Sequence, residues 1–156
     1  MKKFKFNLQR VLDYRQTIED TLLAELAAIQ AEHERELVKL EGMKHELSRF
    51  REKMKVELSQ GSADEIKEAY NYLQQLTRQV LNQQLVVSKV KEKKDQKTLE
   101  VVDAAKDRKA LERLKEYKVA EHRKEADRQE QKFLDEIASI RFGRTRTEDL
   151  ATGGRI

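Results

Sequence analysis

The chain contains no proline, no cysteine and no tryptophan, and only five of its 156 residues are glycine. Without proline, no residue removes a backbone donor from a helix interior. Without cysteine, disulfides and thiolate metal sites are excluded. Hydrophobic residues make up 38% of the chain, below the roughly 45 to 50% of an ordinary globular domain. These absences favour a thin, elongated helical protein over one with a thick core.

Long hydrophobic runs are also missing. No apolar stretch approaches the roughly 18 residues that a membrane-spanning helix needs. Residues 1–6 are basic like the start of a signal peptide, but Asn7, Gln9 and Arg10 interrupt any apolar segment after them. We therefore expect these residues to stay in the mature protein, and any membrane association to go through a partner.

The chain does contain an apolar repeat of about 3.6 residues, on both sides of Gln60-Gly61-Ser62. This repeat predicts two long helices, over about residues 7–59 and 63–142, joined by a turn at 60–62. The predicted fold is all-α: an antiparallel coiled-coil hairpin whose second helix is longer and projects. We expect Gly143 to close this helix, which gives a single domain over residues 1–142.

The remaining residues, 143–156, are polar and contain glycine, so they are predicted to form a disordered tail. At the other end of the domain, Asn7 is the expected N-cap of the first helix. Phe6 and Val11 then have the spacing of a hydrophobic staple across that cap. The local signals therefore place both outer ends of the hairpin.

Each predicted helix carries one apolar seam with steps of three or four residues, which keeps the seam on one face. The seam of the first helix is Leu8, Val11, Arg15, Ile18, Leu22, Leu26, Ile29, His33, Leu37, Leu40, Met43, Leu47, Phe50, Met54 and Leu58. The seam of the second includes Ile66, Tyr70, Leu73, Leu76, Val80, Val87, Val90, Val101, Ala105, Leu111 and Leu114.

The turn has the strongest local signals in the chain. Gly61 fits the left-handed position that commonly follows a helix C-terminus. Ser62 and Glu65 have the spacing of a capping box, in which each side chain accepts a hydrogen bond from the other residue's backbone amide. A tight turn here folds the helices antiparallel, so residues that face each other have numbers that add to about 122.

Charge supports this register. The basic cluster Lys89, Lys91, Lys93 and Lys94 is predicted to face the acidic cluster Glu32, Glu34 and Glu36. Each exposed pair contributes only a few tenths of a kcal/mol, so the clusters test the register more than they stabilise it. The same pairing argues against a nucleic-acid site at the lysines.

The unequal helices leave part of the second one without a partner. By the predicted register, residues from about Tyr117 to Phe142 project beyond the first helix, yet they carry an apolar stripe that a lone helix does not usually expose. Three explanations remain open: coverage by Phe4 and Phe6, self-association, and docking into a groove or ring of another protein. The stripe consists of Phe133, Leu134, Ile137 and Ile140.

No catalytic or metal-binding motif is recognisable. His33, His45 and His122 are scattered, and Gly153-Gly154 follows no strand and so forms no phosphate loop. A two-helix rod also has no pocket that would desolvate a pair of carboxylates. We expect no enzymatic activity, no cofactor and no metal.

Three segments stand out for their sequence: Phe4-Lys5-Phe6-Asn7-Leu8-Gln9-Arg10-Val11-Leu12-Asp13-Tyr14-Arg15, Tyr70-Asn71-Tyr72-Leu73-Gln74-Gln75-Leu76, and Glu130-Gln131-Lys132-Phe133-Leu134-Asp135-Glu136-Ile137-Ala138. In these segments the chain resembles the flagellar FliJ family. The segments are short, but their order and spacing match over nearly the whole chain.

The resemblance implies a stalk of the flagellar type III export apparatus, similar in form to the coiled coil of the rotary ATPase gamma subunit. Such a protein binds the hexameric export ATPase FliI and the export gate FlhA, promotes ATPase assembly, and escorts export chaperones. It is cytoplasmic and associates peripherally with the inner membrane through the apparatus.

The resemblance also implies two sets of contact residues. The ATPase-binding set is Phe4, Leu8, Leu12, Tyr14, Arg15, Gln131, Lys132, Leu134, Asp135 and Glu136. The gate-binding set is Tyr70, Leu73, Thr77, Val80 and Gln84. Leu73 and Val80 have an alternative role as seam residues packed on the first helix.

Two other functions remain open. The first is an equivalent stalk in a non-flagellar type III secretion system. The second is a coiled coil that binds nucleic acid, since the net charge is +4 and the pI is about 9.2. Nucleic-acid binding would show a steep salt dependence, because neutralised phosphates release counterions.

Overall fold

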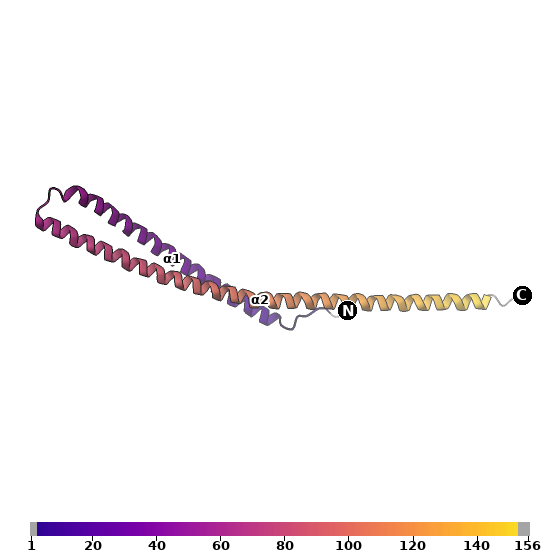
Figure 1. Cartoon of the computed structure of the whole chain (residues 1–156). Coiled ribbons are helices and arrows are strands. Elements are labelled where there is room, and N and C mark those ends of the chain that lie inside the picture. The colour runs from indigo at the N-terminus through magenta and orange to yellow at the C-terminus, as the bar shows by residue number, and fades with distance from the viewer. Residues whose placement is uncertain (1–2, 153–156) are drawn as a thin grey trace. The chain divides into compact units, whose positions relative to one another are not determined.

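The computed structural model describes residues 3–152, apart from the side chains of Asp149 and Thr152 (Figure 1). It contains two α-helices, α1 over Gln9–Glu57 and α2 over Ala63–Thr152, and no strand within the described residues. The prediction of an all-α fold with two long helices, the second longer, is confirmed. The chain divides into two compact units, one of residues 14–107 and the other of residues 3–13 with 108–152.

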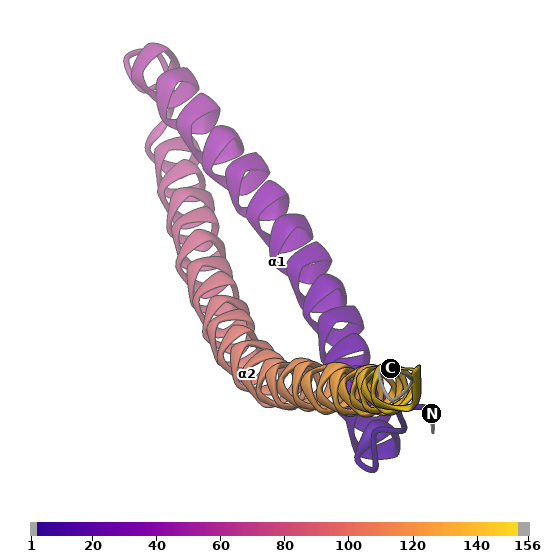
Figure 2. The ribbon, with the colours of Figure 1, turned by 90° about the vertical axis from the view of Figure 1, so that its right-hand side faces the viewer.

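The unit of residues 14–107 is an antiparallel hairpin in which α1 and α2 lie side by side (Figures 1 and 2). Arg15 pairs with Asp107, Glu25 with Lys97, and the rings of Phe50 and Tyr72 lie 4.7 Å apart. The residue numbers of each of these pairs add to 122. The predicted register is therefore confirmed.

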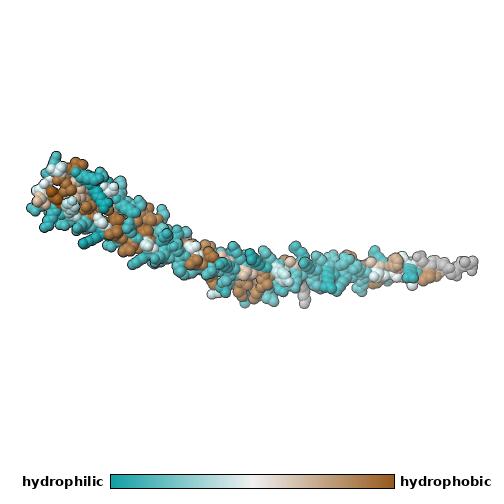
Figure 3. All heavy atoms as spheres, viewed as in Figure 1, coloured by the Kyte–Doolittle hydropathy of each residue, from teal (hydrophilic) through white to brown (hydrophobic). Residues whose placement is uncertain are grey.

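The core of the hairpin is a single apolar cluster near the turn. Its buried members are Leu40, Leu47, Leu76 and Val80, and Met43, Phe50, Leu73 and Val87 pack against it. Figure 3 shows hydrophobic side chains gathered between the two helices in this region. Leu40, Leu47, Leu76 and Val80 all belong to the predicted seams, so the period of 3.6 residues located this core correctly.

The turn confirms one prediction and corrects another. The Ser62 amide donates to the Glu65 carboxylate at 3.1 Å, and the Glu65 amide donates to the Ser62 hydroxyl at 3.4 Å, which completes the predicted capping box. Gly61, however, does not have a positive φ. The chain leaves α1 by another route, because the Gln60 amide donates to the Glu57 carbonyl in a tight turn. The predicted left-handed glycine is therefore wrong.

The start of α1 also differs from the prediction. The Leu8 carbonyl accepts the first helical hydrogen bond, from the Leu12 amide at 2.9 Å, so Leu8 rather than Asn7 is at the N-cap position. A turn precedes it, in which the Gln9 amide donates to the Phe6 carbonyl. The predicted cap is displaced by one residue because Asn7 lies inside this turn.

The end of α2 differs more. The helix passes through Gly143 and continues to Thr152, so the predicted disordered tail is wrong for residues 143–152. The hydroxyl of Thr145 donates to the Arg141 carbonyl at 3.1 Å, and that of Thr147 donates to the Gly143 carbonyl at 2.8 Å. A glycine costs a helix about 1 kcal/mol but does not end it without a cap. The rest of the predicted tail, 153–156, lies outside the described residues.

In the other unit, the segment before α1 lies along α2. The Phe4 ring meets the His122 ring edge-on, with 5.5 Å between their centroids. Leu12 is buried, and with Val119 and Ala120 it lines a shallow hollow on α2. Leu12 thus replaces the predicted seam residues Leu8 and Val11, which are exposed. The N-terminal segment covers α2 around Val119 and His122.

Candidate partner-binding surfaces

An apolar stripe is exposed near the end of α2. Phe133, Leu134 and Ile140 are each between 52% and 62% exposed, and Ile137 between them is half-buried. The positions 133, 137 and 140 repeat with steps of four and three, so they lie on one face of the helix. Phe4 and Leu12 reach α2 at Val119 and His122, which is more than two helical turns before Phe133. The N-terminal segment therefore covers only the first part of the predicted projection.

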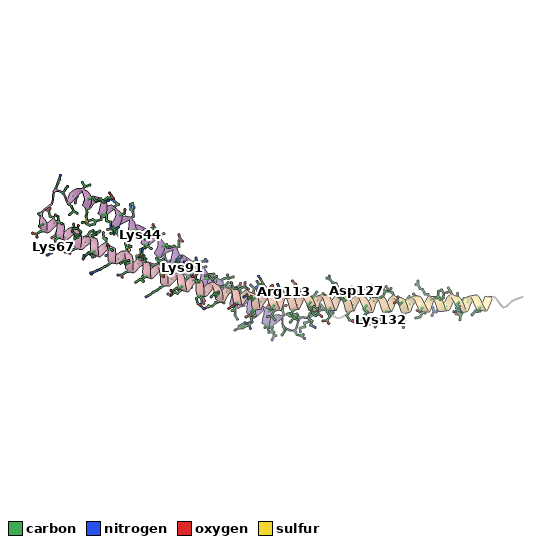
Figure 4. The ribbon with its side chains drawn as sticks, viewed as in Figure 1. Lys44, Lys67, Lys91, Arg113, Asp127 and Lys132 are labelled. Atoms are coloured by element: carbon green, nitrogen blue, oxygen red, sulfur yellow. The ribbon has the colours of Figure 1, made fainter. Side chains whose placement is uncertain are left out.

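The residues predicted on α2 to bind the ATPase surround this stripe. Gln131 donates to Asp135 at 3.0 Å within the helix. Lys132, labelled in Figure 4, and Glu136 are exposed. These four residues and Leu134 are consecutive or nearly so and therefore point to several sides of the helix. The one continuous face in this segment is that of Phe133, Ile137 and Ile140. The predicted set is Gln131, Lys132, Leu134, Asp135 and Glu136.

The residues predicted near the N-terminus have mixed environments. Phe4 is half-buried and Leu12 is buried, so both stabilise their own unit. Leu8 and Tyr14 are exposed. Arg15 donates to Asp107 at 3.2 Å, which ties it to the hairpin. Within this set, Leu8 and Tyr14 have the most surface available to another protein.

The residues predicted to bind the gate divide in the same way. Tyr70 and Gln84 are exposed on α2. Thr77 is half-buried and its hydroxyl donates to the Leu73 carbonyl at 2.8 Å. Val80 is buried in the hairpin core and Leu73 packs against that core, which is the alternative that the sequence left open for both. Tyr70, Thr77 and Gln84 are therefore the members available to a partner.

The hairpin seam becomes polar away from the turn. The Gln83 amide, 7% exposed, donates to both the backbone carbonyl and the carboxylate of Glu36 across the hairpin. Lys97 bonds to Glu25 and Glu100, each at 2.8 Å. Hydrogen bonds to Glu100 and Glu25 raise the pKa of the Lys97 ammonium group. These polar contacts occupy seam positions, where a slipped register would leave buried groups unpaired.

A second polar contact lies beside the core near the turn. The Tyr72 hydroxyl donates to the Glu46 carboxylate at 3.2 Å, and this hydrogen bond raises the pKa of Tyr72. Sequence reasoning missed the pairs Tyr72 with Glu46 and Gln83 with Glu36. Glutamine at the spacing of the seam was the available signal for the second pair.

The predicted charge clusters form no ion pairs. Between residues 3 and 152, no ion pair within 4.0 Å joins Lys89, Lys91, Lys93 or Lys94 to Glu32, Glu34 or Glu36. Glu36 instead accepts from Gln83. The lysines lie mostly on exposed positions of α2, where water solvates them. The register is correct, but the charges that test it are Arg15 with Asp107 and Lys97 with Glu25.

Across residues 3–152, no group of three or more His, Asp or Glu side chains is placed to hold a metal ion. Neither α1 nor α2, over its described residues, has a segment long and apolar enough to cross a membrane.

Comparison with known families places the chain. A protein-family model described as Flagellar FliJ protein matches residues 4–147. No curated protein and no solved structure matches the chain. The matched range contains all of α1, the turn and α2 as far as Thr147, and it therefore includes the hairpin and the exposed stripe of Phe133 to Ile140. The chain belongs to the FliJ family and so to the flagellar protein export apparatus, in which members of this family have a stalk role.

Proposed function

We propose that this protein is a non-enzymatic stalk that binds the hexameric export ATPase FliI through the end of α2, promotes its assembly, and couples it to the export gate FlhA. It works in the cytoplasm, held at the inner membrane through the apparatus. Its escort of export chaperones is part of the same proposal. Membership of the flagellar family favours the flagellar machine over a related secretion system.

The observation that carries the proposal is the exposed stripe of Phe133, Ile137 and Ile140 on an uninterrupted helix. An apolar stripe at helical spacing is the usual means by which a helix docks in an apolar groove or ring. Lys132, Asp135 and Glu136 flank it and supply charged groups at the rim. The binding residues thus combine one apolar face with the charged positions predicted around it.

Gate binding is proposed for the outer side of the hairpin. Tyr70, Thr77 and Gln84 lie on the same side of α2, since steps of seven residues return to nearly the same face. Leu73 and Val80 contribute indirectly, because they pack in the core that holds α2 against α1. Both surfaces lie on the single helix α2, which gives the link that coupling requires.

The test of ATPase binding uses purified export ATPase. Hexamer formation and ATP hydrolysis are measured with the wild-type chain, with Phe133→Ser and with Phe142→Ser as the matched control. Phe142 is also exposed, but nine residues after Phe133 it lies on the opposite side of the helix. We expect the wild-type chain and Phe142→Ser to increase both hexamer formation and the rate of ATP hydrolysis. Phe133→Ser is expected to lose most of this increase. No effect of the wild-type chain would contradict the proposal.

The alternative function, nucleic-acid binding, is tested with the same protein samples. We expect no tight binding to DNA or RNA at physiological salt. Tight binding would instead support the nucleic-acid function if the logarithm of the association constant falls steeply with the logarithm of the salt concentration.

A further inference from the structure

A second apolar stripe lies on α2, within the hairpin but away from α1. Leu81, Leu85, Leu99 and Val102 are each between 42% and 62% exposed. With Ser88, Glu92 and Asp95 they form a series in which steps of four and three residues alternate, and every member is exposed. We name this series the outer stripe. Such spacing is that of a coiled-coil seam, yet α1 does not cover it.

The outer stripe is distinct from the seam that binds α1. The inner seam of α2 over the same stretch runs through Leu76, Val80, Gln83, Val87 and Val90, and these are all buried or half-buried. A step of five residues, from Leu76 to Leu81, turns an α-helix by well over a third of a full rotation. The helix therefore has two faces with coiled-coil spacing, one filled and one open.

The order of residues in the outer stripe is nearly the same in both directions. Two apolar residues, Leu81 and Leu85, stand at one end and two, Leu99 and Val102, at the other, with polar residues between them. A twofold interface needs a surface that is complementary to itself. If two copies lie antiparallel about an axis between residues 91 and 92, the apolar pair at each end meets the apolar pair of the other copy, Leu81 with Val102 and Leu85 with Leu99.

Charge in the middle of the outer stripe fits the same arrangement. Glu92 and Asp95 lie in the stripe, and Lys89 and Lys91 lie beside it on α2 (Figure 4 labels Lys91). In an antiparallel pair about this axis, Asp95 lies opposite Lys89 of the other copy, and Glu92 lies at the axis, beside Lys91 and Glu92 of the other copy. None of these four side chains makes an ion pair with another described residue. Self-complementary charge favours a second copy over an unrelated helix.

We propose that the outer stripe is a self-association surface, through which two copies of the chain pair antiparallel along α2. The stripe spans about 32 Å, or three heptads. An interface of this length is at the small end of specific protein interfaces, so the dimer forms in a concentration-dependent way. The pairing goes beyond the proposed contacts with the ATPase and uses none of the residues of the stripe at Phe133.

Cysteine crosslinking tests the direction of pairing, because the natural chain has no cysteine. The variants Leu85→Cys and Leu99→Cys, which face each other in this arrangement, are oxidised separately and as a mixture. The antiparallel dimer gives a disulfide mainly in the mixture, between one chain of each kind. Val38→Cys, an exposed position of α1, is the matched control and stays uncrosslinked. Disulfides within the separate Leu85→Cys and Leu99→Cys samples would indicate parallel pairing and overturn the proposal.

Sedimentation equilibrium gives the second measurement. The wild-type chain sediments as a monomer that dimerises with concentration, and Leu85→Glu shifts it to the monomer while circular dichroism stays unchanged. Asp95→Lys weakens the dimer, and the added change Lys89→Glu restores it. A wild-type chain that stays monomeric at every concentration, or a dimer that Leu85→Glu leaves intact, would overturn the proposal.

Discussion

Helix α2 carries the same apolar spacing in two regions whose burial is opposite. In the hairpin, Leu76 is 5% exposed because α1 lies against it, whereas Phe133 in the later part of α2 is 62% exposed. Both are apolar side chains in series with steps of three and four residues along one helix. The difference shows that burial here is determined by the presence of a second helix and not by the helix itself. A stripe of apolar residues without such a partner points to a surface that another protein covers.

The largest effect is expected in the buried region. Leu76→Ala removes methyl groups from the hairpin cluster and leaves a cavity, so it lowers the free energy of unfolding by about 2 to 5 kcal/mol. Phe133→Ala removes a larger side chain but changes the same quantity by less than about 0.5 kcal/mol, since the ring is exposed. Urea unfolding followed by circular dichroism measures both. Equal losses in the two variants would mean that Phe133 is packed within the chain.

The turn that joins the two arms of the hairpin is the next most sensitive feature. Ser62→Ala removes the hydroxyl that accepts from the Glu65 amide and lowers the free energy of unfolding by about 1 kcal/mol. Ser59→Ala is the control, because its hydroxyl only bonds to the Val56 carbonyl at the end of α1. The same urea titration measures the free energy of unfolding of both variants. Equal losses in Ser62→Ala and Ser59→Ala would show that the capping box does not stabilise the hairpin.

Gly61 in the same turn is predicted to tolerate a side chain. Its φ is not positive, and an added Cβ would lie 3.2 Å from the Glu65 carboxylate, which accepts from the Ser62 amide but can shift because it ends a flexible side chain. Gly61→Ala therefore changes stability by no more than about 0.5 kcal/mol, or raises it slightly by restricting the unfolded chain. A thermal melt checks this. A loss of about 1 kcal/mol or more would indicate the left-handed backbone that the sequence first suggested.

The smallest effect is electrostatic and appears at high pH. Hydrogen bonds to Glu100 and Glu25 raise the pKa of Lys97 above its usual 10.5, so the folded state binds this proton more tightly than the unfolded chain. The stabilisation is fully present below pH 10.5 and is lost as pH rises through the higher folded pKa. Melting temperatures of the wild type and Lys97→Met therefore differ at neutral pH and converge above that range. Lys67→Met, at an exposed position, serves as the control and shows no such convergence.

Periodicity was sufficient to predict the hairpin and its core. The steps of three and four residues identified Leu40, Leu47, Leu76 and Val80, and the turn fixed the register that Arg15 and Asp107 confirm. These features depend on spacing along one chain, which a sequence displays directly. The capping box was equally visible, because its two residues are three positions apart.

Other features depend on contacts that spacing does not reveal. Gly143 suggested a helix end, but the end depends on whether a cap forms, and the threonines after it bond back to the helix instead. The burial of Leu12 depends on how the N-terminal segment lies against Val119. For the candidate surfaces, sequence named the segment around Leu134, but only exposure separates Tyr70 from the buried Val80.

We propose that the last part of α2 serves a partner and not the stability of the chain. A truncated chain ending at Arg128 keeps the contact of Phe4 with His122 and the whole hairpin, but loses the stripe from Phe133 to Ile140. We predict that its free energy of unfolding stays within about 0.5 kcal/mol of the full chain, while it no longer promotes hexamer formation by the export ATPase. A large loss of stability, or undiminished hexamer formation, would contradict the account.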